Sequence, residues 1–340
     1  MVVRCLDKEK YTSLEIIILA FFLLNSFTTF ILINTFKGVS SIETLISIVI
    51  SFLIGLIFLK KYFNGFKENG ILTNLNIVIR IIFIISSLVI AVYSSFNLSV
   101  FIKDIILPNT NQRIIELSFL ILAFILANKG LKSISISSNL MFVIYMFIFS
   151  ISIIFNLFNA DVFNLLPIKF DINNLKILDT LVYSLGPLYM LLIIPKKEIM
   201  KFDEFKKKMY KSYTFFYIFL LVKILFIIAV LGEKYFAFVS YPELEILKII
   251  NIFNFFQRLE EVLIIDIFVE SLIVTSFAMC YAASLMKCKK LDLKKGNIIS
   301  LIVIFLGVVN LEILPSNILF VTLVLFIIIN NFLCFKKDKP

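Results

Sequence analysis

The chain has 340 residues, of which 61% are hydrophobic, and it carries a formal net charge of +10 at pH 7. Soluble domains are roughly half apolar, so this much apolar surface is not expected to fit in one soluble core and is expected to face lipid. Histidine is absent, which excludes imidazole catalysis, histidine metal sites and histidine pH switches.

The charge and the cysteines add two further exclusions. No compact basic domain or RNA-binding signature accompanies the positive charge, so no nucleic acid partner is expected. Cys5, Cys280, Cys288 and Cys334 show no C-x-x-C spacing, and we expect reduced thiols. No metal site or cofactor is predicted.

Apolar segments long enough for membrane crossings recur along the whole chain. A bilayer core of roughly 30 Å needs about 20 apolar residues per helix. Residues 1–11 are polar and the next run continues to residue 36, which favours a first crossing over a cleavable signal. The predicted crossings are residues 13–36, 41–59, 76–101, 114–128, 136–158, 177–195, 212–232, 259–286, 296–312 and 316–335. We expect one integral membrane domain, all-α and polytopic, with about ten transmembrane helices.

The first crossing has a polar interruption. Asn25, Ser26, Thr28 and Thr29 lie near its middle, without a glycine. In the third crossing Arg80 lies near one end and is expected to extend to the interface, while Tyr93 lies deeper.

Lysine and arginine residues predict the topology. Most of the 33 fall in alternate loops, and short cytoplasmic loops are enriched in such residues. This pattern supports ten crossings with both termini in the cytoplasm. The basic stretch 196–211 is read as a topology signal near anionic lipid, with binding of an acidic partner as the alternative.

The sixth crossing contains Gly186-Pro187. With ten crossings, the first five and the last five run in opposite orientations, which suits a five-plus-five inverted repeat over about 13–158 and 177–335. In such folds the first helix of each half is broken beside a midplane site. Gly186-Pro187 therefore predicts either a ligand site or a plain kink.

Two later segments carry polar residues of interest. Residues 240–257 predict a helix along the outer face, with Leu244 and Leu247 on its apolar side. Lys223, Asp266 and Glu270 lie deep in the seventh and eighth crossings. We expect Lys223 to pair with one of the two carboxylates, either in an ion or proton pathway or as a packing contact.

Several short motifs resemble those of one family. Residues 127–130 and 164–168, read as Ala-Asn-Lys-Gly and Asn-Leu-Leu-Pro-Ile, resemble the "A-x-K-G … N-L-L-P" passage of GerAB-type spore germination proteins. Residues 241–242, 251–252 and 257–260 are similar to its "P … R-x-E" segment. The family belongs to the amino acid–polyamine–organocation transporter superfamily, so the resemblance implies the LeuT-like inverted-repeat fold. One departure is that residues 24–27 read Leu-Asn-Ser-Phe where such transporters have a glycine-rich break.

The resemblance also implies a function. Members act as B subunits of germinant receptors in the inner membrane of the spore, with an A-type membrane subunit and a C-type lipoprotein. A small germinant, usually an amino acid, would bind between the first and sixth helices and trigger germination. The alternative is an ion-coupled amino acid or polyamine permease. A membrane enzyme is not expected, because no nucleophile–base pair is evident. The predicted ligand-binding residues are Asn25, Ser26, Thr28, Tyr93, Ser184, Gly186 and Pro187.

Overall fold

The computed structural model describes residues 10–66, 76–166, 170–249, 260–286, 293–309 and 317–335. Within these ranges every regular element is a helix and no strand is present. One isolated β-bridge joins the chain before the first helix to the segment 198–200. The amide of Tyr11 donates to the carbonyl of Glu198 at 2.7 Å, and the amide of Met200 donates to the carbonyl of Tyr11 at 2.9 Å. The described chain is therefore all-α.

In the described residues the α-helices run from α1 to α13 in chain order. The first predicted crossing comprises α1 (Ser13–Asn25), a π-helical turn (Thr28–Leu32) and α2 (Ile33–Thr35). The remaining helices are α3 (Ser41–Tyr62), α4 (Ile77–Ile105), α5 (Gln112–Asn128), α6 (Leu131–Asn156), α7 (Ile177–Leu188), α8 (Phe202–Leu231), α9 (Glu233–Phe238), α10 (Pro242–Ile249), α11 (Glu260–Met286), α12 (Leu293–Val309) and α13 (Asn317–Phe335).

Every predicted apolar segment contains a helix. In the described residues, 6 helices are long and apolar enough to cross a membrane: Ser41–Gly65, Ile77–Ile105, Leu131–Asn159, Ile172–Ile193, Phe202–Leu231 and Ile264–Met286. Shorter apolar helices lie at Ser13–Asn25, Lys295–Gly307 and Ile318–Asn331. The chain is thus a polytopic membrane protein, and the count of about ten crossings stays a prediction.

Local sequence explains where several helices begin. Thr12 and Glu15 form a capping box at α1, in which each side chain accepts from the other's backbone amide. Ser40 and Glu43 do the same at α3. Lys132, at the start of α6, lies 2.8 Å from a Glu15 carboxylate oxygen and so ties α6 to α1.

One boundary differs clearly from prediction. The seventh crossing was expected from residue 212, but α8 begins at Phe202. Its first ten residues are rich in lysine and acidic residues, which are good helix formers although they are too polar for the bilayer core. The helix therefore continues beyond the apolar run.

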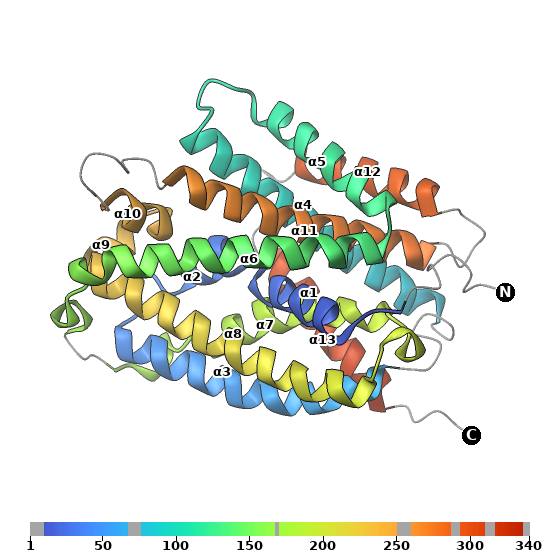
Figure 1. Ribbon diagram of the computed structural model, residues 1–340, viewed down its shortest axis with the longest axis horizontal. Coiled ribbons are helices and arrows are strands. Elements are labelled where there is room, and N and C mark those ends of the chain that lie inside the picture. Colours follow the sequence, from blue (N-terminus) through green and yellow to red (C-terminus); the bar gives the residue numbers. More distant parts are fainter. Residues whose placement is uncertain are drawn as a thin grey trace.

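The long helices lie side by side along the longest axis of the molecule (Figure 1). α9 and α10 lie at the opposite end of the bundle from the start of α1 and the end of α13 (Figure 1). Burial differs among the long apolar helices. In the most apolar 18-residue stretch of Ile172–Ile193, 78% of the residues are buried, and the share is the same in Ile264–Met286, whereas in Leu131–Asn159 it is 17%. α7 and α11 therefore lie in the core, and α6 presents much of its apolar surface to lipid.

α9 and α10, called the outer cap after the predicted topology, are partly as predicted. α10 covers the first half of the expected helix 240–257, and Leu244 and Leu247 are buried. The rest of that helix, from residue 250, lies outside the described residues, as do residues 167–168 and 251–259 of the family-like motifs. Asn164, from the first motif passage, donates to the carbonyl of Ala229 at 2.8 Å and ties its loop to the end of α8.

Candidate functional site: a buried polar network at the break in the first helix

The first helix is interrupted where the sequence predicts. α1 ends at Asn25, Ser26 and Phe27 form a turn, and a π-helical turn begins at Thr28. A π-turn shifts the backbone hydrogen bonds by one residue, and such turns are frequent at functional sites. The break occurs without glycine, since Asn25, Ser26 and Thr28 supply the side-chain groups that satisfy it.

Asn25 is the centre of the network. Its side chain is fully buried, and its amide nitrogen donates to the Tyr145 hydroxyl at 2.8 Å and to a Glu270 carboxylate oxygen at 3.0 Å. Tyr145 belongs to α6 and Glu270 to α11. One side chain at the break therefore links three helices.

Ser26 and Thr28 satisfy backbone carbonyls that the break leaves unpaired. The Ser26 hydroxyl donates to the carbonyl of Leu23 at 2.8 Å. The Thr28 hydroxyl lies 2.8 Å from the Asn25 carbonyl oxygen and 2.6 Å from the Asn25 side-chain oxygen. The freed end of α1 is therefore closed by its own side chains.

Tyr93 lies apart from these contacts. It is buried on α4, beside the backbone of Leu319 in α13 and near Tyr183 of α7. The Tyr183 ring in turn lies 6.2 Å from the ring of Phe27, at the break. Phe27 and Tyr183 therefore link the break to α7 by aromatic packing.

The predicted interruption of the sixth crossing is a change of helix type. α7 contains Gly186 and Pro187, and from Tyr189 the chain continues as a 3-10 helix to Ile193. Pro187 has no N–H for the preceding turn, which favours this tightening. The Tyr62 hydroxyl donates to the carbonyl of Leu188, where the 3-10 helix begins, at 3.3 Å. A Cβ on Gly186 would lie 2.7 Å from Leu323, so α13 packs directly on this glycine.

Ser184 contacts α8 rather than the helix-1 break. Its hydroxyl lies 2.7 Å from the Thr180 carbonyl oxygen and 3.0 Å from the Tyr217 hydroxyl. In the described part of the chain, no side-chain hydrogen bond joins Ser184, Gly186 or Pro187 to Asn25. The structure therefore places six of the seven predicted ligand-binding residues in two groups, at the break after α1 and on α7, which pack against each other, while Tyr93 lies apart on α4.

Lys223 has an ion pair that the sequence analysis did not predict. Its ammonium lies 2.7 Å from a carboxylate oxygen of Glu243 on α10, and both side chains are largely buried. Asp266 and Glu270 are also buried and interact electrostatically with Lys223. That Lys223 pairs with one of these two stays a prediction.

A small cavity of about 40 Å³ lies beside these charges. Lys223, Glu243, Asp266 and Tyr145 contribute to its lining, together with apolar side chains of α6, α8 and α10. A water molecule needs roughly 10–15 Å³ of such volume, so the cavity suits water and is too small for an amino acid. Tyr145 lines this cavity together with Glu243 of α10 and also bonds to Asn25, so the cavity lies between α10 and the break.

Two members of the network were missed from the sequence. Tyr145 is a polar group deep within an otherwise apolar stretch of α6, which is the signal that identifies it. Glu243 was assigned to the polar face of the outer helix, and nothing in the sequence shows that this helix lies on the end of α8.

A second contact holds the outer cap. The Tyr241 hydroxyl donates to an Asp104 carboxylate oxygen at 3.1 Å. Burial raises the pKa of Tyr241, and the negative charge of Asp104 raises it further. The hydroxyl therefore keeps its proton at neutral pH and remains a donor.

Among the residues that the structure describes, no group of three or more His, Cys, Asp or Glu side chains is arranged to hold a metal ion.

The family model for "Spore germination protein" matches residues 42–318. That range includes Tyr145, Lys223 and Glu270 and begins after Asn25. No curated protein matches the chain significantly.

Proposed function

The chain belongs to the spore germination protein family, and from this premise we propose that it is the nutrient-sensing membrane subunit of a spore germinant receptor. It binds a small germinant, an amino acid in the first instance, beside the break in the first helix. The observation that carries the proposal is the pair of bonds from Asn25 to Tyr145 and Glu270, because they gather polar groups of three helices at the break.

The charges of this region favour a ligand with an ammonium group. α1 ends at Asn25, so its partial negative pole faces the break. Glu270 adds a carboxyl group there, and in discontinuous membrane helices such carbonyl ends bind cations. An amino acid would present its ammonium group to Glu270 and the α1 carbonyls.

The network also provides a means of signalling. The hydroxyls of Ser26 and Thr28 occupy carbonyl oxygens that a ligand would otherwise contact. A ligand that replaces these bonds, and the bond from Asn25 to Glu270, changes how the two halves of the first helix are held to α6 and α11. A ligand shifts an equilibrium only by such differential contacts.

A LeuT-like inverted repeat is part of this proposal and is supported by the helix contacts. If α1, α3, α4, α5 and α6 form the first half and α7, α8, α11, α12 and α13 the second, contacts come in matched pairs. In this assignment α1 is equivalent to α7, α3 to α8, and so on in chain order. The contact of α3 with α7 is then equivalent to the contact of α8 with α1, and the contact of α1 with α6 to that of α7 with α13. α4 with α5 corresponds to α11 with α12, and α4 with α13 corresponds to α11 with α6.

We further propose that the subunit works in the inner membrane of the spore with both termini cytoplasmic. Its partners would be the A-type and C-type receptor subunits. It is a ligand-gated sensor rather than an enzyme.

An ion-coupled amino acid or polyamine permease remains the second candidate, and one observation favours it. Among the described residues of the Lys223 cluster, one ammonium group faces the carboxyl groups of Glu243, Asp266 and Glu270. Buried charge of one sign is costly, so this cluster favours uptake of a proton or a cationic solute.

The deciding experiment compares germination with transport. Spores lacking this chain are supplied with single amino acids and sugars, and labelled uptake is measured in vegetative cells that express the chain. A receptor predicts the loss of response to one nutrient with no uptake of it. Saturable uptake with normal germination would make the protein a permease.

A further inference from the structure

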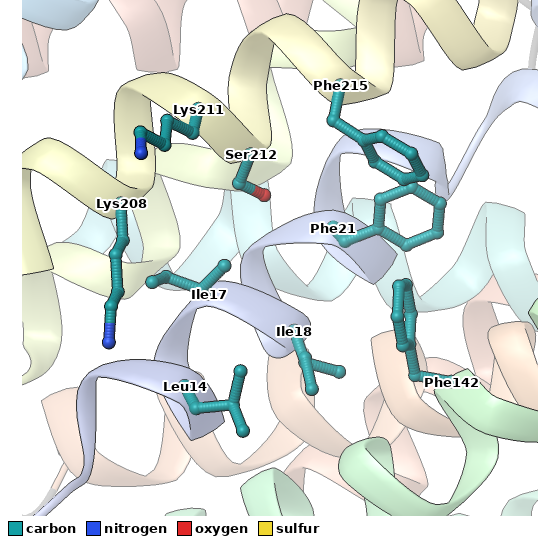
Figure 2. A pocket seen from close by; sticks show the side chains of 9 residues that line it. All are labelled: Leu14, Ile17, Ile18, Phe21, Phe142, Lys208, Lys211, Ser212 and Phe215. Atoms are coloured by element: carbon teal, nitrogen blue, oxygen red, sulfur yellow. The ribbon is translucent and has the colours of Figure 1, made fainter.

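A surface groove lies between α1, α6 and α8 (Figure 2). Its volume is about 320 Å³. It is lined by Leu14, Ile17, Ile18, Phe21, Phe142, Lys208, Lys211, Ser212 and Phe215.

Most of the groove is apolar and reaches the lipid-facing surface. The side chains of Leu14 and Phe215, both apolar, are 57% and 42% exposed. Phe21, Phe142 and Phe215 close one end, and Figure 2 shows the two lysines at the other. The walls therefore suit a hydrocarbon chain.

The charged end lies at the level of the lipid headgroups. α8 has 30 residues, so it is about 45 Å long at 1.5 Å per residue and exceeds the roughly 30 Å core. Lys208 and Lys211 lie in its polar first part, and the predicted crossing, residues 212–232, starts just after them. Their ammonium groups are thus placed where a phospholipid carries its phosphate.

Lys211 supplies the uncompensated charge. Lys208 pairs with Glu204, one turn earlier, and lies 3.3 Å from the Ser13 hydroxyl. Lys211 is exposed and makes no ion pair within the described residues. The lysine end of the groove therefore has a net positive charge.

We propose that this groove binds an anionic phospholipid of the surrounding leaflet. Its phosphate lies against Lys211 and Lys208, and an acyl chain lies between α1 and α8 as far as the phenylalanines. Phe21 is one helical turn before Asn25, so the lipid contacts the half-helix that ends at the break. This inference does not depend on which ligand the break binds.

The test is native mass spectrometry of the chain released from membranes with equal amounts of phosphatidylglycerol and phosphatidylcholine. The wild type is expected to retain phosphatidylglycerol preferentially. The variant Lys208→Gln/Lys211→Gln should lose about thirtyfold in that preference, since each lysine near a membrane surface contributes roughly fivefold. The matched control Lys206→Gln/Lys207→Gln removes the same charge from α8 outside the groove lining and should retain the lipid.

A second pair of variants tests the acyl chain. Leu14→Trp fills the groove and should reduce retention of the lipid, whereas Leu53→Trp, at a similarly exposed position on α3, should not. Equal losses in both lysine pairs, or a photo-crosslink from position 14 to a protein instead of a lipid, would overturn the proposal.

Discussion

The two interrupted helices at the centre of the bundle differ in what satisfies them. The break in the first helix is polar, and Asn25 joins it to Tyr145 and Glu270. The change of helix type after Gly186-Pro187 is enclosed by Leu323 and by aromatic rings. The sequence signal was stronger at Gly186-Pro187, but the polar contacts gather at the break that lacks glycine.

This difference teaches that an interruption and a binding site are separate properties. Pro187 breaks the regular hydrogen bonding because it lacks an N–H. A site additionally requires polar groups from other helices, and those come to Asn25. The proposed germinant site therefore centres on the first helix, and we expect α7 mainly to supply a wall.

The largest expected effect comes from the charges that hold the polar region. Lys223→Met leaves the Glu243 carboxylate without its ammonium partner and removes the positive charge near Asp266 and Glu270. Removing one partner of a buried ion pair costs about 3–5 kcal/mol, so the protein should be strongly depleted from the membrane. Quantitative immunoblotting of membranes measures this.

The control removes a carboxylate together with the lysine. Lys223→Met/Glu243→Gln should recover part of the lost protein, since the two side chains touch and their effects are coupled. Normal levels and normal germination of Lys223→Met alone would show that the pair supports neither folding nor function.

The next effect tests whether Gly186 serves packing. Gly186→Ala places a methyl group against Leu323 and should cost about 1–3 kcal/mol through overpacking. Thermal unfolding in detergent measures the loss, and Gly186→Ala/Leu323→Ala should recover stability and the nutrient response together. If stability returned while the response stayed absent, Gly186 would belong to the ligand site.

The smallest effect concerns the outer cap. Tyr241→Phe removes the bond to Asp104 and should lower stability by about 0.5–1.5 kcal/mol without altering the nutrient response. Comparison of unfolding midpoints and germination curves checks both parts. A changed response would mean that the cap takes part in sensing.

Much of the fold follows from apolar runs, since lipid requires every crossing to satisfy its own backbone. α8 begins earlier than predicted, because the segment from Phe202 to Lys211 is helical without being apolar. The end of the first helix was predictable from Asn25, Ser26 and Thr28, whose side chains compete for backbone groups. Family membership was also predicted correctly from short motifs.

The partners of the site residues were less predictable. Depth along a helix places Lys223 and Glu270 at similar levels, but helical rotation decides which groups touch. To predict the contact of Glu243 with Lys223, one must know that α10 lies on the end of α8. To predict the contact of Tyr145 with Asn25, one must know that α6 faces α1. Such contacts between distant segments are set by packing, which one sequence does not display.

The most direct test of a ligand site at the first-helix break compares Asn25→Leu with Ser26→Ala in spores supplied with single nutrients, at equal protein levels. Asn25 bonds to two other helices, whereas the Ser26 bond stays within its own helix. Asn25→Leu should raise the half-maximal nutrient concentration at least about a hundredfold, which corresponds to roughly 2.7 kcal/mol, and Ser26→Ala less than about threefold. Equal responses of the two variants would contradict a ligand site at this break.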